Sequence, residues 1–109
     1  MEEGKEEQSP APYSVMARNR QVAADWEVLK RQRPDICRRC WEHLSTNPRE
    51  RIGSRYVPLR GPQKFVDYQG QMLPQWQYEI DNRARVKLGI GDGFVVIISV
   101  ATGHPRENE

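Results

Sequence analysis

In the segment NRARVKLGI, residues 82–90, charged and aliphatic side chains alternate from Arg83 to Leu88. Arg83, Arg85 and Lys87 fall on one parity, and Ala84, Val86, Leu88 and Ile90 fall on the other. Successive side chains of a β-strand point to opposite faces of the sheet. The stretch therefore predicts a strand that buries an aliphatic row and holds three cations in line on its opposite face.

The segments on both sides of this stretch predict further antiparallel strands. Before it, the apolar residues of WQYEI (76–80) alternate with polar ones, and an Asp-Asn pair supplies a turn. After it, Gly-Asp-Gly at 91–93 is a hairpin signal that leads into FVVIISVA at 94–101. That last segment is apolar on both parities, which is typical of a central strand covered on most of both faces. Residues 64–69 predict one more strand.

Two amphipathic helices precede these strands. Val22, Trp26 and Leu29 recur at helical spacing and predict a helix over residues 18–32. A second helix starts at Pro34, a residue that is tolerated in a first helical turn. The apolar stripe of the second helix consists of Ile36, Cys37, Cys40, Trp41 and Leu44. Both stripes are expected in the core, and so are all three tryptophans of the chain.

The order of these elements determines the predicted fold class. A short strand within residues 12–17 is followed by the two helices and then by three or four antiparallel strands. The helices have one aliphatic sheet face to cover. We therefore expect an α+β fold, with two N-terminal helices packed on a small antiparallel β-sheet whose other face is partly open.

Length and charge predict one domain with a basic surface. A chain of 109 residues is long enough for a modest core of its own. Residues 1–11 carry four Glu and one Lys and predict an acidic, disordered tail. Without that tail, residues 12–109 hold 16 Lys+Arg against 11 Asp+Glu, a net charge of +5 that favours an anionic partner. The longest apolar run is far below the roughly 20 residues of a membrane span, and no signal peptide is evident, so a cytoplasmic location is expected.

The Cys37-Arg38-Arg39-Cys40 spacing resembles half of a zinc site. It lies inside a predicted helix, and the chain has no second cysteine pair to complete four ligands. Both cysteines also fall on the apolar stripe, where a free cysteine behaves as a small hydrophobic residue. We therefore expect them to pack in the core, and we expect no metal.

The predicted row of three cations has two interpretations. It is either a solvated outer sheet face with cross-strand ion pairs or a groove that binds a phosphate backbone. Like charges about 6.6–6.8 Å apart on one strand repel each other, which favours an anionic ligand. The loop over residues 49–61 brings further cations to such a groove, namely Arg49, Arg51, Arg55 and Arg60. His104, after the last strand, is placed for proton transfer at neutral pH or is incidental.

Five short motifs together resemble the RelE/ParE superfamily of bacterial toxins. They are NPRE at 47–50, LRG at 59–61, WQYEI at 76–80, RVKLGIGDG at 85–93 and ATGHP at 101–105. Their order and spacing carry the resemblance, which covers residues 13–105. It implies a compact α+β fold like that of the microbial ribonucleases, so that residues 12–109 form one RelE-like toxin domain.

The RelE-type members imply a specific activity, a metal-independent mRNA endoribonuclease that works in the ribosomal A site and inhibits translation. The 2′-hydroxyl attacks the adjacent phosphorus, and no cofactor takes part. By position, Arg85 would stabilise charge on the scissile phosphate, His104 would be a general acid or base, and Glu79 would be a base if it faces the groove. The RNA-binding residues expected around them are Arg83, Lys87, Arg60, Arg55 and Arg51.

The resemblance also implies a partner and leaves alternatives open. The cognate antitoxin is expected to be an acidic, partly disordered protein, and the other partner is mRNA on the ribosome; no membrane is expected. The chain departs from many nuclease members, because no Tyr follows His104 and because Lys87 stands where an aromatic residue is common. These departures leave room for a ParE-like toxin that acts on DNA gyrase by protein contact, or for a non-catalytic nucleic-acid or protein interaction domain.

Overall fold

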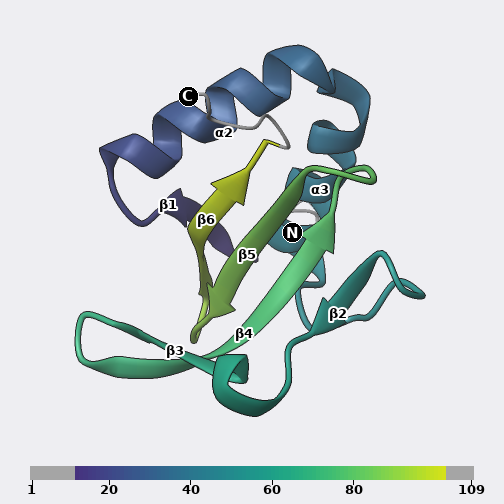
Figure 1. Ribbon diagram of the computed structural model, residues 1–109. Coiled ribbons are helices and arrows are strands. Elements are labelled where there is room, and N and C mark those ends of the chain that lie inside the picture. Colours follow the sequence, from purple (N-terminus) through teal and green to yellow (C-terminus); the bar gives the residue numbers. More distant parts are fainter. Residues whose placement is uncertain (1–11, 103–109) are drawn as a thin grey trace, which may run out of the picture.

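The computed structural model of the protein describes residues 12–102 (Figure 1). In chain order the elements are β1 (Ser14–Ala17), α2 (Arg20–Gln32), α3 (Pro34–Thr46), β2 (Tyr56–Pro58), the short 3₁₀ helix η1 (Gly61–Gln63), β3 (Phe65–Tyr68), β4 (Gln71–Glu79), β5 (Arg85–Ile90) and β6 (Phe94–Ala101). The predicted acidic tail at residues 1–11 lies outside the described residues.

The strands form a mixed sheet in the order β1-β6-β5-β4-β2, and β3 pairs with the first half of β4. Neighbouring strands are antiparallel except at one edge, where β1 runs parallel to β6 with Ser14 opposite Phe94. The predicted α+β arrangement of two helices on a sheet is confirmed. The sheet is mixed, and not wholly antiparallel as predicted, because β1 pairs with β6 in the parallel direction.

The two helices follow each other with only Arg33 between them, and in Figure 1 α2 runs across the top of the sheet while α3 lies behind it. Helix α2 begins two residues later than predicted, because the Arg18 N–H donates to the Ile97 carbonyl and extends the β1 pairing. The side chain of Asn19 then caps the helix by accepting from the Val22 N–H at 2.9 Å. None of the helices formed by residues 12–102 is both long and apolar enough to span a lipid bilayer.

The main core lies between the helices and the aliphatic face of β5 and β6. The predicted row is buried: Val86 and Leu88 are fully covered, and Ala84 and Ile90 are 1% exposed. They pack with residues of β6 and with both helices in one hydrophobic cluster. The alternation in residues 84–90 therefore predicted correctly which side of β5 faces the helices.

A second, smaller core covers part of the opposite face. The β3–β4 hairpin folds over the sheet, so that Leu73 and Val66 pack on Val96 and Ile98. Gly89 makes this possible, because a Cβ atom there would lie 3.1 Å from both Leu73 and Val66 side-chain atoms. Consequently only the end of this sheet face that carries Arg85 stays open, and β6 is covered on both faces as predicted.

The helical stripes are core except at one position. Cys37 and Cys40 are free thiols with no exposed surface, which confirms their predicted place in the core. Trp26 is 5% exposed, and Trp76 is partly buried against the same cluster. The prediction for Trp41 was wrong, because it is 38% exposed. Its ring packs 5.7 Å from that of Trp26 but lies at the outer side of the helix pair.

Candidate functional site

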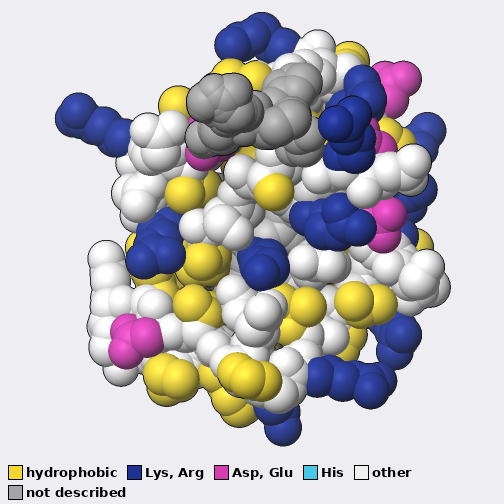
Figure 2. Space-filling model, in the orientation of Figure 1, with side chains coloured by type: hydrophobic (Ala, Val, Ile, Leu, Met, Phe, Trp, Pro, Cys, Tyr) yellow, Lys and Arg dark blue, Asp and Glu magenta, His cyan; other side chains and the backbone are white. Residues whose placement is uncertain are grey.

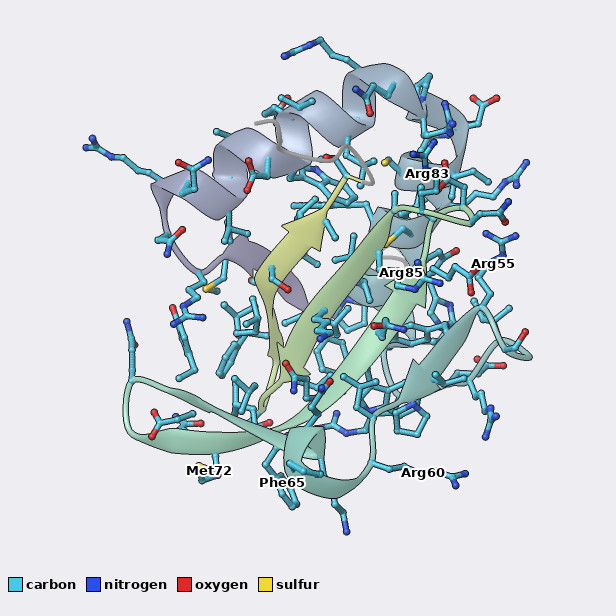
Figure 3. All side chains as sticks on the ribbon, viewed as in Figure 1. Arg55, Arg60, Phe65, Met72, Arg83 and Arg85 are labelled. Atoms are coloured by element: carbon cyan, nitrogen blue, oxygen red, sulfur yellow. The ribbon has the colours of Figure 1, made fainter. Side chains whose placement is uncertain are left out.

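The candidate site is the part of the sheet face that neither the helices nor the β3–β4 hairpin covers. Strand β5 places Arg85 and Lys87 here, on the parity opposite to its buried aliphatic residues, and both are half-buried. Arg85 stands between Glu79 of β4 and Ala101 of β6. Figure 3 shows Arg85 on the near side of the sheet, and in Figure 2 Lys and Arg side chains (dark blue) lie over this face.

The cations of this face have no acidic partner among residues 12–102. The ion pairs of that part of the chain join Lys30 to Glu27, Arg33 to Asp81 and Arg38 to Asp35. Glu79 is the cross-strand neighbour of Arg85, as its parity predicted, yet no ion pair joins them. Two neighbouring cations without ion pairs form a surface that gains energy from an anionic ligand.

Arg83 does not continue this row, which corrects the prediction of three cations in line on one strand. Strand β5 begins only at Arg85, and residues 81–83 form the turn after β4. The turn closes because the Ile80 N–H donates to the Ala84 carbonyl at 2.9 Å. The exposed Arg83 side chain thus extends from the turn beside the site (Figure 3).

Asp81 organises this turn, a role that the sequence analysis missed. One of its carboxylate oxygens, Oδ1, accepts hydrogen bonds from the N–H groups of Arg83 and Ala84, both at 2.8 Å. The other, Oδ2, accepts from Nε of Arg33 at 2.8 Å. The two N–H donors, followed by the Arg33 guanidinium, hold the pKa of the Asp81 carboxyl below its usual range. The Asp-Asn turn signal marked the position, but a partner 48 residues away in sequence gives no local signal.

Arg55 lies at the edge of the site and is already engaged. Its Nη1 donates to the backbone carbonyls of Glu79 and Ile80, at 2.9 and 3.3 Å. Arg55 thereby holds the end of β4 where Glu79 is located. Its side chain also lines a cleft with Arg39 and Tyr78 on the side of α3, so it reaches around the sheet edge and does not stand in the row with Arg85.

The structure does not bring the other predicted loop arginines to this face. Arg51 donates to the Gly53 carbonyl within its own loop, at 3.0 Å. Arg49 donates to the hydroxyl of Tyr13 at 2.8 Å, near the start of β1. Arg60 lies beside η1, at the end of the molecule opposite to Arg83 (Figure 3). His104 lies outside the described residues.

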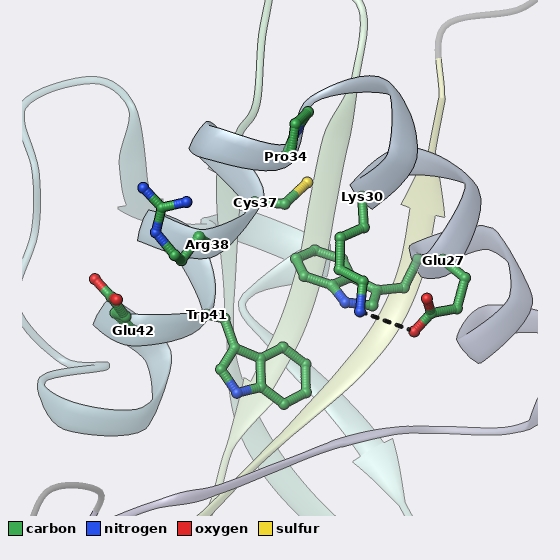
Figure 4. Close-up of a pocket in the computed structure, with 8 residues that line it drawn as sticks. Glu27, Lys30, Pro34, Cys37, Arg38, Trp41 and Glu42 are labelled. Atoms are coloured by element: carbon green, nitrogen blue, oxygen red, sulfur yellow. Dashed lines mark ion pairs between the residues drawn. The ribbon is translucent and has the colours of Figure 1, made fainter.

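A second surface feature is a groove of about 520 Å³ between the two helices (Figure 4). Trp26 and Trp41 contribute its aromatic wall, and the thiol-bearing Cys37 lies deeper. The Glu27–Lys30 ion pair, at 3.3 Å, lies on one margin, and Arg38 and Glu42 lie on the other. The groove faces away from Arg85, so two separate surfaces are presented, one cationic and one largely apolar.

Comparison with known proteins gives a likeness in structure. A chain of the archaeal RelE–RelB complex from Pyrococcus horikoshii OT3 superimposes with a TM-score of 0.60 over 86% of this chain and 99% of that one, at 15% sequence identity. The chain has a RelE-like fold. No protein-family model matches the sequence, and no curated protein does. At this identity the likeness is one of architecture, and it confirms the fold predicted from the five motifs.

In this RelE-like fold the open face has the chemical groups to handle a phosphodiester. Arg85 supplies several N–H donors in a plane that matches phosphate oxygens. Lys87, two residues along the same strand face, supplies a mobile point charge. Glu79 supplies a carboxylate beside Arg85, without an ion pair to any residue of 12–102. Two cations and a carboxylate are the kinds of group that phosphate binding and proton transfer require.

Proposed function

We propose that the protein is the toxin of a toxin–antitoxin pair and that it is a metal-independent endoribonuclease that cleaves mRNA on the ribosome, in the cytoplasm. The observation that carries this proposal is the Arg85–Lys87 pair beside Glu79 on the open sheet face of a RelE-like fold. A face that carries two cations without ion pairs to residues 12–102 suits an RNA backbone better than it suits solvent alone.

The proposed reaction is an internal transfer of the phosphoryl group. Glu79 takes the proton of the 2′-hydroxyl, whose oxygen attacks the adjacent phosphorus. Arg85 stabilises the extra negative charge on the phosphate oxygens in the transition state. The bond to the 5′-oxygen breaks, and His104, which the resemblance gives as a general acid or base, protonates that oxygen. The products are a 2′,3′-cyclic phosphate and a free 5′-hydroxyl, so neither water nor a redox step is needed.

Lys87 and Arg83 bind the flanking phosphates in this proposal. Lys87 is on the same strand face as Arg85, and Arg83 extends from the adjoining turn. Arg55 acts mainly by holding the β4 end that carries Glu79, through its two backbone hydrogen bonds. Arg60, at the end of the molecule opposite to Arg83 (Figure 3), and Arg51, which is bonded within its own loop, would contact RNA away from the scissile phosphate or the ribosome.

The proposed partner is an acidic, partly disordered antitoxin. The RelE–RelB complex provides the precedent of a chain of this fold in a complex with a second protein. An acidic segment on the open face would neutralise Arg85 and Lys87 and so block RNA by charge complementarity. The apolar groove with Trp41 offers a second contact area for such a protein.

Tightly controlled expression with primer extension on cellular mRNAs tests the proposal. The wild type should arrest growth and produce discrete new 5′ ends within messages. Arg85→Ala should abolish both, whereas Arg31→Ala, which removes an exposed arginine of α2, should change neither. Arrest that persists in Arg85→Ala, or arrest with intact messages and damaged DNA, would contradict the nuclease and favour a protein-binding toxin such as a gyrase poison.

A further inference from the structure

We propose that Asp81 is a positioning residue for Arg85, and that it acts through the turn between β4 and β5. The inference rests on the proposed function only in assigning Arg85 to the scissile phosphate. The positioning itself concerns the protein alone and can be tested without RNA. It assigns a role to a carboxylate that stands next to the site but contacts no predicted RNA-binding side chain.

Both oxygens of Asp81 are used within the protein. Oδ1 accepts from the backbone N–H groups of Arg83 and Ala84, each at 2.8 Å, and Oδ2 accepts from Arg33 Nε at 2.8 Å. A carboxylate with three charge-assisted bonds of this length is well fixed. Since Asp81 is anionic and committed to these donors, it is unsuited to contact RNA directly.

The ordered turn forms a hydrogen bond with the Arg85 side chain through one backbone carbonyl. Nη1 of Arg85 donates to the carbonyl oxygen of Asn82, at 3.2 Å. Asn82 lies between Asp81 and the two N–H groups that Asp81 binds, so the carboxylate fixes the direction of this carbonyl. An arginine side chain has large rotamer entropy, and one hydrogen bond to a rigid acceptor restricts it before the substrate arrives.

Arg33 ties the turn to the helical layer. It is the single residue between α2 and α3, so its backbone is held by two helix ends. Its N–H donates to the Leu29 carbonyl at 2.8 Å, and its side chain crosses to Asp81 beside a small cavity that also touches Arg83. Arg33 in the helical layer therefore holds Asp81, Asp81 holds the turn, and the turn contacts Arg85 on the open sheet face.

Substitutions at three positions separate this role from a merely structural one. Asp81→Ala removes both acceptor oxygens and therefore all three hydrogen bonds. Asp81→Asn keeps an oxygen for the two N–H donors but loses the charge and the acceptor for Arg33 Nε. Arg33→Ala removes only the tie to the helices. Asp92→Ala, in the exposed turn between β5 and β6, is the matched control, since no side-chain hydrogen bond of Asp92 is found among residues 12–102.

Two measurements are made on each folded variant, with circular dichroism as the check of folding. The first is single-turnover cleavage of mRNA on programmed ribosomes. The kcat of Asp81→Ala should fall by about 10- to 100-fold with little change in KM, because a misplaced catalytic group costs rate more than binding. Asp81→Asn and Arg33→Ala both keep the bonds to the two N–H groups and lose the bond to Arg33, so both should fall between Asp81→Ala and the wild type, and Asp92→Ala should match the wild type.

The second measurement is NMR without RNA. In Asp81→Ala, amide exchange at Arg83 and Ala84 should speed up by at least about tenfold, and the Arg85 Nε–H signal should broaden or shift. Neither should change in Asp92→Ala. If Asp81→Ala fails to fold, Arg33→Ala tests the positioning role in its place. Its cleavage rate, its amide exchange at Arg83 and Ala84 and its Arg85 signal should then change in the same directions but by smaller amounts.

The outcomes distinguish this inference from the proposed function. Cleavage that is lost in Arg85→Ala but normal in folded Asp81→Ala overturns the positioning role. A wild type that never cleaves overturns the proposed function, and the NMR result then judges the positioning alone. The positioning role is also overturned if Asp81→Ala leaves both the amide exchange at Arg83 and Ala84 and the Arg85 Nε–H signal unchanged.

Discussion

Glu79 and Arg85 are directly paired residues of β4 and β5, yet their side chains form no ion pair. Arg85 donates instead to the Asn82 carbonyl, and Arg55 holds the backbone carbonyl of Glu79. Carboxylate and guanidinium thus stand side by side without neutralising each other. In the proposed mechanism this leaves Glu79 to accept a proton and Arg85 to bind phosphate.

Glu79→Gln should lower the cleavage rate by about 10²- to 10⁴-fold, the usual contribution of a general base. RNA binding should not weaken, because the change removes a negative charge from a cationic face. Single-turnover cleavage and fluorescence anisotropy measure the two effects. Glu50→Gln, an exposed glutamate of the neighbouring loop, is the control. Normal cleavage together with tighter RNA binding would assign Glu79 an electrostatic role only.

Lys87→Ala should weaken RNA binding to a similar degree for every sequence, because a lysine that contacts phosphate reads no base. The dependence of log K on log salt should become less steep by about 0.7 for single-stranded RNA, the value of one lost phosphate contact. Anisotropy titrations with short RNA at several salt concentrations measure this slope. A slope equal to that of the wild type would place Lys87 outside the RNA contact.

Trp26 and Trp41 should differ strongly in their contribution to stability, although both belong to helical stripes. Trp26→Ala should cost about 3–5 kcal/mol, because it leaves a cavity in the core. Trp41→Ala should cost less than about 1.5 kcal/mol, since its ring is 38% exposed. Urea unfolding monitored by circular dichroism gives both values. Equal losses would mean that Trp41 is as deeply packed as Trp26.

Cys37 should be inert to thiol reagents in the folded protein. Burial raises the pKa of its thiol from 9.0 to about 11, and the Lys30 ammonium offsets only part of that rise. A raised pKa favours the neutral thiol, so this contribution to stability is complete below pH 9 and is lost as the pH rises towards 11. At pH 8, alkylation should be detectable only after addition of denaturant. Rapid alkylation of the native protein would contradict the packing of Cys37.

Much of the fold was predictable because it follows from local periodicity. The alternation in residues 84–90 fixed which face of β5 is buried, and the doubly apolar run at 94–101 predicted the central strand correctly. The Gly-Asp-Gly turn formed where expected, with the Gly91 N–H bonded to the Phe94 carbonyl. In each case a single face or turn decides the conformation, so short-range pattern is sufficient.

The errors arose where partners distant in sequence decide the structure. Arg83 left the strand because Asp81 captures its N–H, and Arg33 holds that carboxylate from between the helices. Trp41 fits a helical stripe, but it lines the open groove between the helices and is 38% exposed, whereas Trp26 is 5% exposed. Helical spacing says which residues share a face and does not say how far the opposing layer extends.

The parallel contact of β1 with β6 has a consequence for the timing of folding. Ser14 pairs with Phe94, so the edge strand β1 can pair only after a partner 80 residues later in the chain has been synthesised. Strand β5, which carries Arg85, is likewise completed only by β6. A chain emerging during synthesis therefore has no finished cationic surface until residues 94–101 are free. Under the proposed function, the nascent chain would lack a complete RNA-binding face while the ribosome is still synthesising it.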